Sequence, residues 1–273
     1  MLWDRDIPRR VFTDANGMYR ADALRRLVGY FDDPRVGCVC GELIYLNYSR
    51  NAVADGYNKY WRFDQLQKRL ESRLDCLLGA NGSIFAIRKP LYRPLPNSVC
   101  NDMVLPILVA AAGYAVVYAP DAVSTEAGSS DLGEELRRRP RIIARGILGV
   151  AAVWGDVRRS GHRLLAWELF WRKVVRYAQP FLLLLLLLSS AFLPAPWHLL
   201  AAAQLAVYVA APLGALLPEG RLRRLTAPAM YFGVGIMAAS LAWIQLLSGR
   251  DFSKWQTVTR THERELEPMR RAG

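Results

Sequence analysis

Asp14 and Asn16 place two oxygen-bearing side chains two positions apart, directly after residues 10–13, which favour a strand. The carboxyl end of a strand is where open α/β sheets bind ligands. A carboxylate there can hold Mg²⁺ or Mn²⁺ while a diphosphate supplies further oxygen ligands. The same residues can also form an Asx turn before the next helix, so these residues alone leave both interpretations open.

Asp102 is a second acidic candidate, because it begins a predicted, mostly apolar helix over residues 101–112. A positioned carboxylate can take the proton of a hydroxyl group as that group attacks a carbon. General-base help of this kind is worth on the order of 10² to 10⁴ in rate. The alternative is purely structural, since the helix dipole favours an acidic side chain at any helix N-terminus.

An arginine cluster occupies residues 137–141 and has two open interpretations. Its members are Arg137, Arg138, Arg139 and Arg141. Guanidinium groups bind phosphate oxygens well, which favours a diphosphate site. A row of positive charge beside a membrane would have the same composition. The two roles are compatible, so neither excludes the other.

The elements that must position these residues alternate between strand and helix, which predicts an α/β fold with helices on the faces of a sheet. Strands are expected at residues 10–13, 36–46, 83–87 and 114–119, and helices around residues 24–31, 51–74 and 101–112. We expect the strand at 36–46 to pair beside the first strand. Residues 79–82 form a tight, glycine-rich turn.

The second half of the chain is predicted to lie in a membrane. The protein has 273 residues, is 52% hydrophobic and carries a net charge of +12, with basic and apolar stretches kept apart. Apolar runs at residues 174–194, 197–217 and 226–247, uncharged apart from Arg176, are each about long enough to cross roughly 30 Å of hydrocarbon. This segregation favours membrane lipids over nucleic acid as the partner of the basic residues.

Charge also predicts the orientation of these runs. The basic stretch at residues 218–224 belongs in the cytoplasm. The first two runs are therefore expected to form a hairpin that crosses the membrane outward and then returns to the cytoplasm. The tail at residues 250–273 is basic as well, which favours a third run that is interfacial or re-entrant over one that crosses. We therefore expect a multi-pass protein of the cytoplasmic (plasma) membrane, with its catalytic part in the cytoplasm.

Several motifs, taken in order, resemble the membrane-bound family-2 glycosyltransferases, relatives of cellulose, hyaluronan, chitin and poly-N-acetylglucosamine synthases. The matching segments are residues 11–16, 32–37, 79–88, 101–102, 113–114, 118–122 and 138–142. The resemblance covers residues 11–260. It implies a GT-A nucleotide-sugar domain at residues 1–157, an interface helix and membrane region at 158–249, and a basic cytoplasmic tail at 250–273.

The resemblance also implies roles for individual residues. Asp14 and Asn16 match the metal motif DxD, with asparagine at the second acidic position, and imply a divalent Mg²⁺ or Mn²⁺ cofactor. Asp102 matches the catalytic base. The substrate-binding residues would be Asn81 and Gly82 in an acceptor-side loop, Arg138, Arg139 and Arg141 on the diphosphate, and Trp255 and Arg260 over the nucleotide. Arg138 replaces the family's glutamine, and Ile142 replaces its tryptophan.

The expected activity is inverting transfer of a sugar from a nucleotide-sugar donor, a UDP-sugar, to a growing polysaccharide at the membrane. One alternative is a transferase that glycosylates a lipid-linked acceptor. Another is an inactive membrane protein that only binds a partner. In the resembling family, a strand–helix–strand unit that binds the nucleoside precedes the DxD motif, and this sequence has no counterpart of it. The chain is therefore expected to be truncated, which leaves open whether it is an enzyme by itself.

Overall fold

The computed structural model describes residues 9–46, 63–127, 132–217 and 220–252. Its first half contains a five-stranded mixed sheet with the strand order β1-β4-β3-β5-β2. The strands are β1 (Arg9–Phe12), β2 (Met18–Tyr19), β3 (Val36–Leu46), β4 (Phe85–Arg88) and β5 (Ala115–Ala127). Only β3 and β5 run parallel, and the other neighbours are antiparallel.

The expected pairing of residues 36–46 with the first strand is wrong, because β4 lies between β1 and β3. Antiparallel pairing places Phe12 opposite Phe85, and their rings stack with centroids 4.4 Å apart. Such cross-strand aromatic pairs stabilise one register over another. The first strand therefore ends beside the glycine-rich turn that leads into β4.

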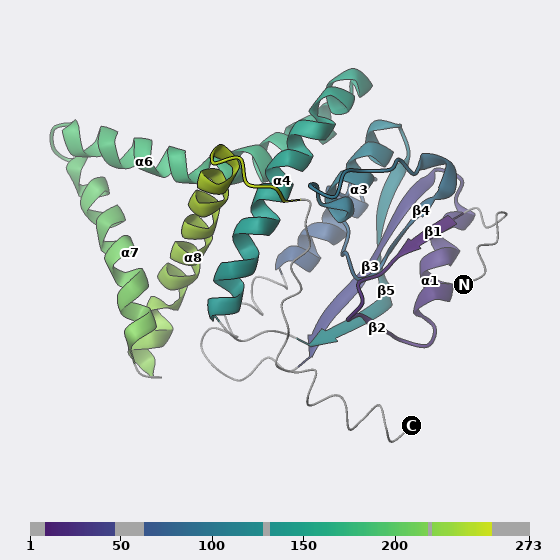
Figure 1. Cartoon of the computed structure of the whole chain (residues 1–273), viewed down its shortest axis with the longest axis horizontal. Helices are drawn as coiled ribbons and strands as arrows, with labels where there is room; N and C mark the ends of the chain where they lie inside the picture. Colours follow the sequence, from purple (N-terminus) through teal and green to yellow (C-terminus); the bar gives the residue numbers. More distant parts are fainter. Residues whose placement is uncertain (1–8, 47–62, 128–131, 218–219, 253–273) are drawn as a thin grey trace.

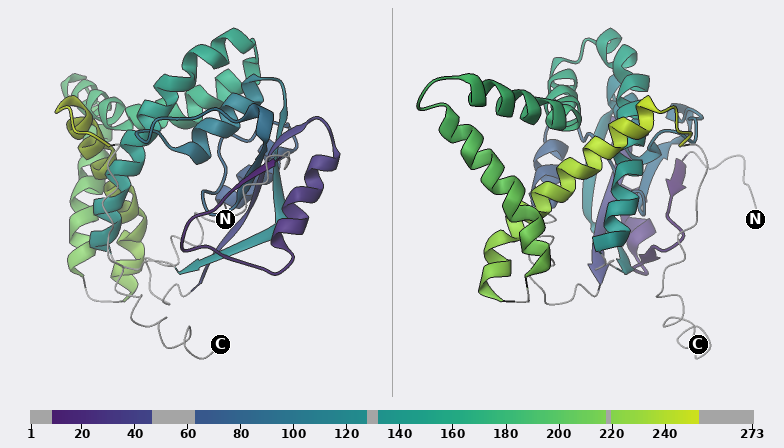
Figure 2. Two further views of the ribbon diagram at one scale, coloured as in Figure 1. Left: turned by 45° about the vertical axis from the view of Figure 1, so that its right-hand side comes forward. Right: turned by 60° about the vertical axis from the view of Figure 1, so that its left-hand side comes forward.

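Helices cover both faces of the sheet, which explains why β3 is apolar on both sides (Figures 1 and 2). On one face, α1 (Ala23–Gly29) and the short 3₁₀ helix η1 (Tyr30–Asp32) bury Leu27 and Phe31. On the other face, α3 (Asn101–Ala111) buries most of its side chains. Residues 63–72 are also helical, and a second 3₁₀ helix, η2 (Lys89–Leu91), follows β4.

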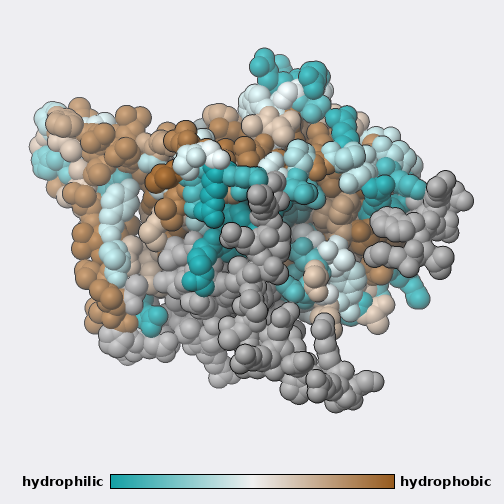
Figure 3. All heavy atoms as spheres, viewed as in Figure 1, coloured by the Kyte–Doolittle hydropathy of each residue, from teal (hydrophilic) through white to brown (hydrophobic). Residues whose placement is uncertain are grey.

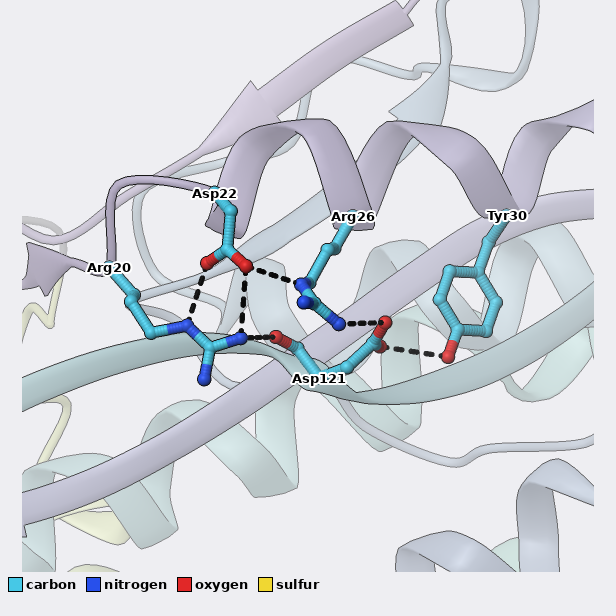
Figure 4. Close-up of polar contacts among 5 residues, drawn as sticks. All are labelled: Arg20, Asp22, Arg26, Tyr30 and Asp121. Atoms are coloured by element: carbon cyan, nitrogen blue, oxygen red, sulfur yellow. Dashed lines mark hydrogen bonds and ion pairs between the residues drawn. The ribbon is translucent and has the colours of Figure 1, made fainter.

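A group of surface ion pairs fastens α1 to β5 (Figure 4). The Asp22 carboxylate accepts hydrogen bonds of 2.6 Å from the Nε atoms of both Arg20 and Arg26. Arg26 also pairs with Asp121, which accepts a 2.9 Å hydrogen bond from the Tyr30 hydroxyl. These charges hold one helix on the sheet and lie apart from the candidate site described below.

The described residues of the second half are helical apart from short turns between the helices and after the last one. The helices are α4 (Leu132–Ser160), α5 (Arg163–Leu169), the π-helical segment η3 (Phe170–Val175), α6 (Arg176–Phe192), α7 (His198–Leu216) and α8 (Arg221–Leu247). The predicted boundary at residue 157 falls inside α4, and Leu165 and Leu169 of α5 belong to the main core beside the sheet. The first half therefore packs as one body with α4 and α5.

Hydrophobic side chains are gathered on the surfaces of α6 and α7 (Figure 3). Within the described residues, two helical stretches are long and apolar enough to cross a bilayer, Arg163–Phe192 and Leu225–Leu247. His198–Gly214 is a shorter apolar helix. The third apolar run forms one continuous helix, α8, which packs along α7 and against α4.

Candidate active site

Asp14 lies exposed in the turn that follows β1. The turn is closed by a 3.1 Å hydrogen bond from the Gly17 amide to the Asp14 carbonyl oxygen. Tyr19 then ties the turn to the next part of the site, because its hydroxyl donates a 3.0 Å hydrogen bond to the Ser83 carbonyl oxygen. Burial raises the pKa of the Tyr19 hydroxyl, so this tyrosine stays a neutral donor.

Gly82 brings Asp14 and Asp102 together. A Cβ atom at Gly82 would lie 3.2 Å from Asp14 Oδ2 and 3.4 Å from Asp102 Oδ2. The two carboxylates therefore approach the same point from the end of β1 and the start of α3. Neither forms an ion pair with any residue that the structure describes. A residue without a side chain at this point leaves room for a ligand between them.

Backbone hydrogen bonds hold the Gly82 turn in place. The Ala80 amide donates to the Asp102 carbonyl oxygen at 2.7 Å, which joins the turn to α3. Asn81 points inward: its Nδ2 donates to the Gly41 carbonyl oxygen at 2.6 Å. The Asn81 side chain is buried and also accepts a hydrogen bond from Lys68, so its contacts here are with protein. A role in acceptor binding stays a prediction for Asn81.

Lys68 lies at the centre of a buried polar network beneath this turn. Its ammonium group bonds Asn81 and forms a 2.7 Å ion pair with Asp64, one helical turn earlier. Next to this pair, the Tyr118 hydroxyl donates to the Glu42 carboxylate, and burial raises the pKa values of both side chains. The network therefore holds the Gly82 turn in a fixed position against β3.

Asp102 lies in a mixed electrostatic environment. Burial raises the pKa of its carboxyl group, the nearby Lys173 and Arg145 lower it, and Asp14 raises it. The opposing effects come from three different elements: the turn after β1, α4 and the η3 segment. Burial, with a further contribution from Asp102, also raises the pKa of Cys100 to about 12, so this thiol stays protonated at neutral pH.

The predicted arginines lie on α4, and the structure brings Arg141 toward the site. Arg138, Arg139 and Arg141 are half-buried. Burial and the neighbouring Arg145 lower the pKa of Arg141, whereas Cys100 raises it. The Cys100 thiol also lies 3.8 Å from the Ile142 carbonyl oxygen. The arginine helix therefore passes directly beside the N-terminus of α3.

Sequence reasoning missed Arg145 and Lys173. Arg145 donates a hydrogen bond to the Val99 carbonyl oxygen, just before α3. Lys173 belongs to η3, and one turn later the Tyr177 hydroxyl contacts the sulfur of Met103 at 3.9 Å. The position of Arg145, four residues after Arg141, was a signal that could have found it. Lys173 carried no such signal, because its positive charge is equally expected at a membrane interface.

Oxygen ligands at this site fit a hard divalent cation, but few protein side chains supply them. No group of three or more His, Cys, Asp or Glu side chains is positioned to hold a metal among the described residues. Asp14 and Asn16 are both exposed at the turn, so they could ligate a cation whose other ligands come from water or phosphate. Trp255 and Arg260 lie outside the described residues.

Comparison with known proteins identifies the fold and the family. A mannosyltransferase from Pyrobaculum calidifontis, solved in complex with GDP-Man and Mn²⁺, has a similar structure, with a TM-score of 0.52 and 18% sequence identity. The match covers 89% of this chain and 63% of that protein, and it supports a GT-A-like fold. No curated protein matches the sequence. The family model described as glycosyl transferase family group 2 matches residues 11–211, and the chain therefore belongs to this family.

Proposed function

We propose that this protein is an inverting, metal-dependent glycosyltransferase that transfers a sugar from a nucleotide-sugar donor to a growing polysaccharide at the cytoplasmic membrane. The observation that carries the proposal is the approach of Asp14 and Asp102 to one point at Gly82. Two carboxylates without ion-pair partners among the described residues provide a place for a cation and for a proton acceptor. Both roles are needed for transfer to a hydroxyl group.

Asp102 would act as the general base. It would take the proton of the acceptor hydroxyl as that oxygen attacks the anomeric carbon from the side opposite the leaving diphosphate. Lys173 and Arg145 favour the charged form of Asp102, which is the form that can accept a proton. Their position supports this role, because burial alone disfavours the charged form of the carboxyl group.

Asp14 and Asn16 would hold Mg²⁺ or Mn²⁺. When bound, such a cation neutralises charge on the diphosphate. On the other side of the site, Arg141, with Arg138 and Arg139, would bind phosphate oxygens and favour departure of the diphosphate. The burial of Arg141 beside Cys100 supports this assignment, since a partly desolvated guanidinium group binds anions more strongly. Trp255 and Arg260 would cover the nucleotide, as expected from the sequence.

We propose that α6 and α7 cross the membrane and that α8 is an interfacial or re-entrant helix, so that the tail stays on the cytoplasmic side. Tyr177 at the start of α6 contacts Met103, and Phe252 after α8 packs against Ala144 of α4, so both ends of the apolar region meet the catalytic half. If both ends of the apolar region lie on the same side of the membrane, the polypeptide crosses the membrane an even number of times. The exposed apolar surfaces of α6 and α7 favour these two helices as the crossing pair (Figure 3).

Transfer assays on membranes that contain the full chain test this proposal. Labelled UDP-sugars and GDP-mannose would be supplied with Mn²⁺, beside an Asp102→Asn control. We expect incorporation with one donor class and its loss in the control. A polymeric product supports polysaccharide synthesis, whereas a single sugar on lipid indicates a lipid-carrier transferase. If no donor is used by this chain while a version extended upstream is active, the chain by itself is not an enzyme.

A further inference from the structure

The helix at residues 63–72 and the turn that follows it expose apolar side chains to the surface and bury charged ones. Its apolar side chains Phe63, Leu66, Leu70 and Leu74 are 61%, 54%, 50% and 54% exposed. They recur every three or four residues, so they form one stripe along the helix. A helix that only covered a sheet would turn this stripe inward.

The opposite side of this helix carries charge into the protein. Lys68 and Glu71 are buried, and Asp64 is partly buried beside Lys68. Lys68 bonds Asn81 beneath the Gly82 turn, whereas Glu71 forms an ion pair with Arg172 of η3. These contacts fix the rotation of the helix about its axis. The outward position of the apolar stripe is therefore imposed by the buried charges.

A second exposed apolar group lies on α5 and η3, and η3 contacts the same helix through the buried residue Glu71. The Glu71–Arg172 ion pair brings η3 against this helix. Next to Arg172, the side chains of Trp167, Phe170 and Trp171 are 61%, 41% and 53% exposed. Tryptophan is enriched at the boundary between lipid and water. The chain then continues directly into α6, which belongs to a helical stretch, Arg163–Phe192, that is long and apolar enough to cross a bilayer.

We propose that the stripe of Phe63, Leu66, Leu70 and Leu74, together with Trp167 and Trp171, is a membrane-docking surface that lies in the headgroup region of an anionic bilayer. The proposal rests on the membrane location in the proposed function and extends it to the catalytic half. Arg69 on this helix and Arg73 in the turn that follows it are exposed, where they complement negatively charged headgroups. This flanking charge, and the continuity with α6, favour lipid over a protein partner.

Docking at this helix would position the active site relative to the membrane. Lys68 connects the helix to Asn81, and Gly82 follows Asn81 between the two site carboxylates. The docked helix is thus linked to the site through the hydrogen bond between Lys68 and Asn81. An acceptor that grows at, or is anchored in, the membrane would meet the site at a fixed depth.

Spin-label depth measurements on the full chain test the proposal. The chain would be reconstituted in vesicles of phosphatidylglycerol and phosphatidylcholine, with Cys100→Ser throughout because the other cysteines are buried. Labels would be placed by Leu66→Cys and Leu70→Cys. Arg25→Cys on α1 is the matched control for water, and Leu185→Cys on α6 is the control for lipid; both side chains are exposed. Accessibility to oxygen and to a water-soluble nickel complex reports depth.

We expect the labels at 66 and 70 to favour oxygen over nickel, as at 185, and the label at 25 to show the reverse. Labels at 66 and 70 that behave like the one at 25 would overturn the docking surface. Immobilised labels that neither reagent reaches would overturn it too, and would indicate a second copy or another protein on the stripe. A water-exposed label at 185 refutes the membrane location itself. None of these readings needs activity, so loss of transfer with lipid-immersed labels refutes only the proposed enzyme.

Discussion

The carboxylates on the α1 surface and those at the Gly82 turn differ in what surrounds them. Asp22 and Asp121 are each matched by arginine, and Tyr30 donates a further hydrogen bond to Asp121 (Figure 4). Asp14 and Asp102 approach one another instead, and neither has an ion-pair partner among the described residues. Bringing two acids together costs free energy, whereas pairing each with arginine does not.

This difference separates charges that hold the fold from charges that are available to a ligand. The α1 pairs are exposed, so they are screened by solvent and contribute little individually. At the Gly82 turn, the neighbouring cations Lys173 and Arg145 are provided by helices from the second half of the chain. The site is therefore complete only when α4 and η3 pack against the sheet. The predictions below test the contrast between these two regions.

Asp102→Asn is expected to have the largest effect. Loss of the proton acceptor should lower the rate of transfer by roughly 10² to 10⁴, with thermal stability nearly unchanged. Initial rates with labelled donor in membranes measure this. Asp121→Asn is the matched control, because it makes the same chemical change in the α1 region and should leave the rate unaltered. Equal losses in the two variants would contradict the contrast.

Lys68→Met should mainly reduce stability. The change leaves Asp64 and Asn81 without their ammonium partner in a mostly buried place, and removal of one member of a buried pair costs about 3 kcal/mol. Thermal denaturation of the detergent-solubilised chain measures the loss. Arg25→Met removes an exposed charge from α1 and serves as the control. A melting temperature as high as that of the control would show that the network is dispensable.

Gly82→Ala should impair activity without unfolding the protein. The added Cβ would lie 3.2 Å from Asp14 Oδ2, so the carboxylates must move apart by a few tenths of an ångström. A displacement of this size should lower the rate by about tenfold, since misplacement by 1 Å can cost 10². Gly29→Ala is the control, because no atom lies within 4 Å of a Cβ there. Full activity in Gly82→Ala would show that the substrate does not bind between Asp14 and Asp102.

Local periodicity was enough to predict several elements. The strand at 36–46 and the helix beginning at residue 101 are confirmed as β3 and α3, because both are apolar over most of their length. The strand predicted at residues 114–119 is longer in the structure, where β5 continues through Pro120 to Ala127. A register shift after Gly41 in β3, opposite Ala119, places Pro120 in an irregular part of the ladder, where a missing amide donor is tolerated.

Non-local contacts explain what the sequence could not predict. Insertion of β4 between β1 and β3 depends on pairing between distant segments, which local pattern does not encode. The contribution of Lys173 beside Asp102 depends on how η3 packs against α3. By contrast, the sequence was enough to predict three site residues, because each lies at the end of a predicted strand, turn or helix: Asp14, Gly82 and Asp102. The resemblance supplied their roles, and these remain predictions.

Asp22→Asn should have the smallest effect, and pH and salt distinguish it from the site variants. Arg20 and then Arg26 hold the pKa of the Asp22 carboxyl below its ordinary value, so its pairing stabilises the fold above about pH 4, where the unfolded chain is also ionised. This contribution falls away as the pH drops through the lower folded-state pKa. Because Asp22 is solvent-exposed, high salt should weaken it further. We therefore expect the variant to melt slightly lower than the parent at pH 7 in low salt, and to match it in high salt. A difference that persists in high salt would show that Asp22 stabilises α1 through its hydrogen bonds rather than through its charge.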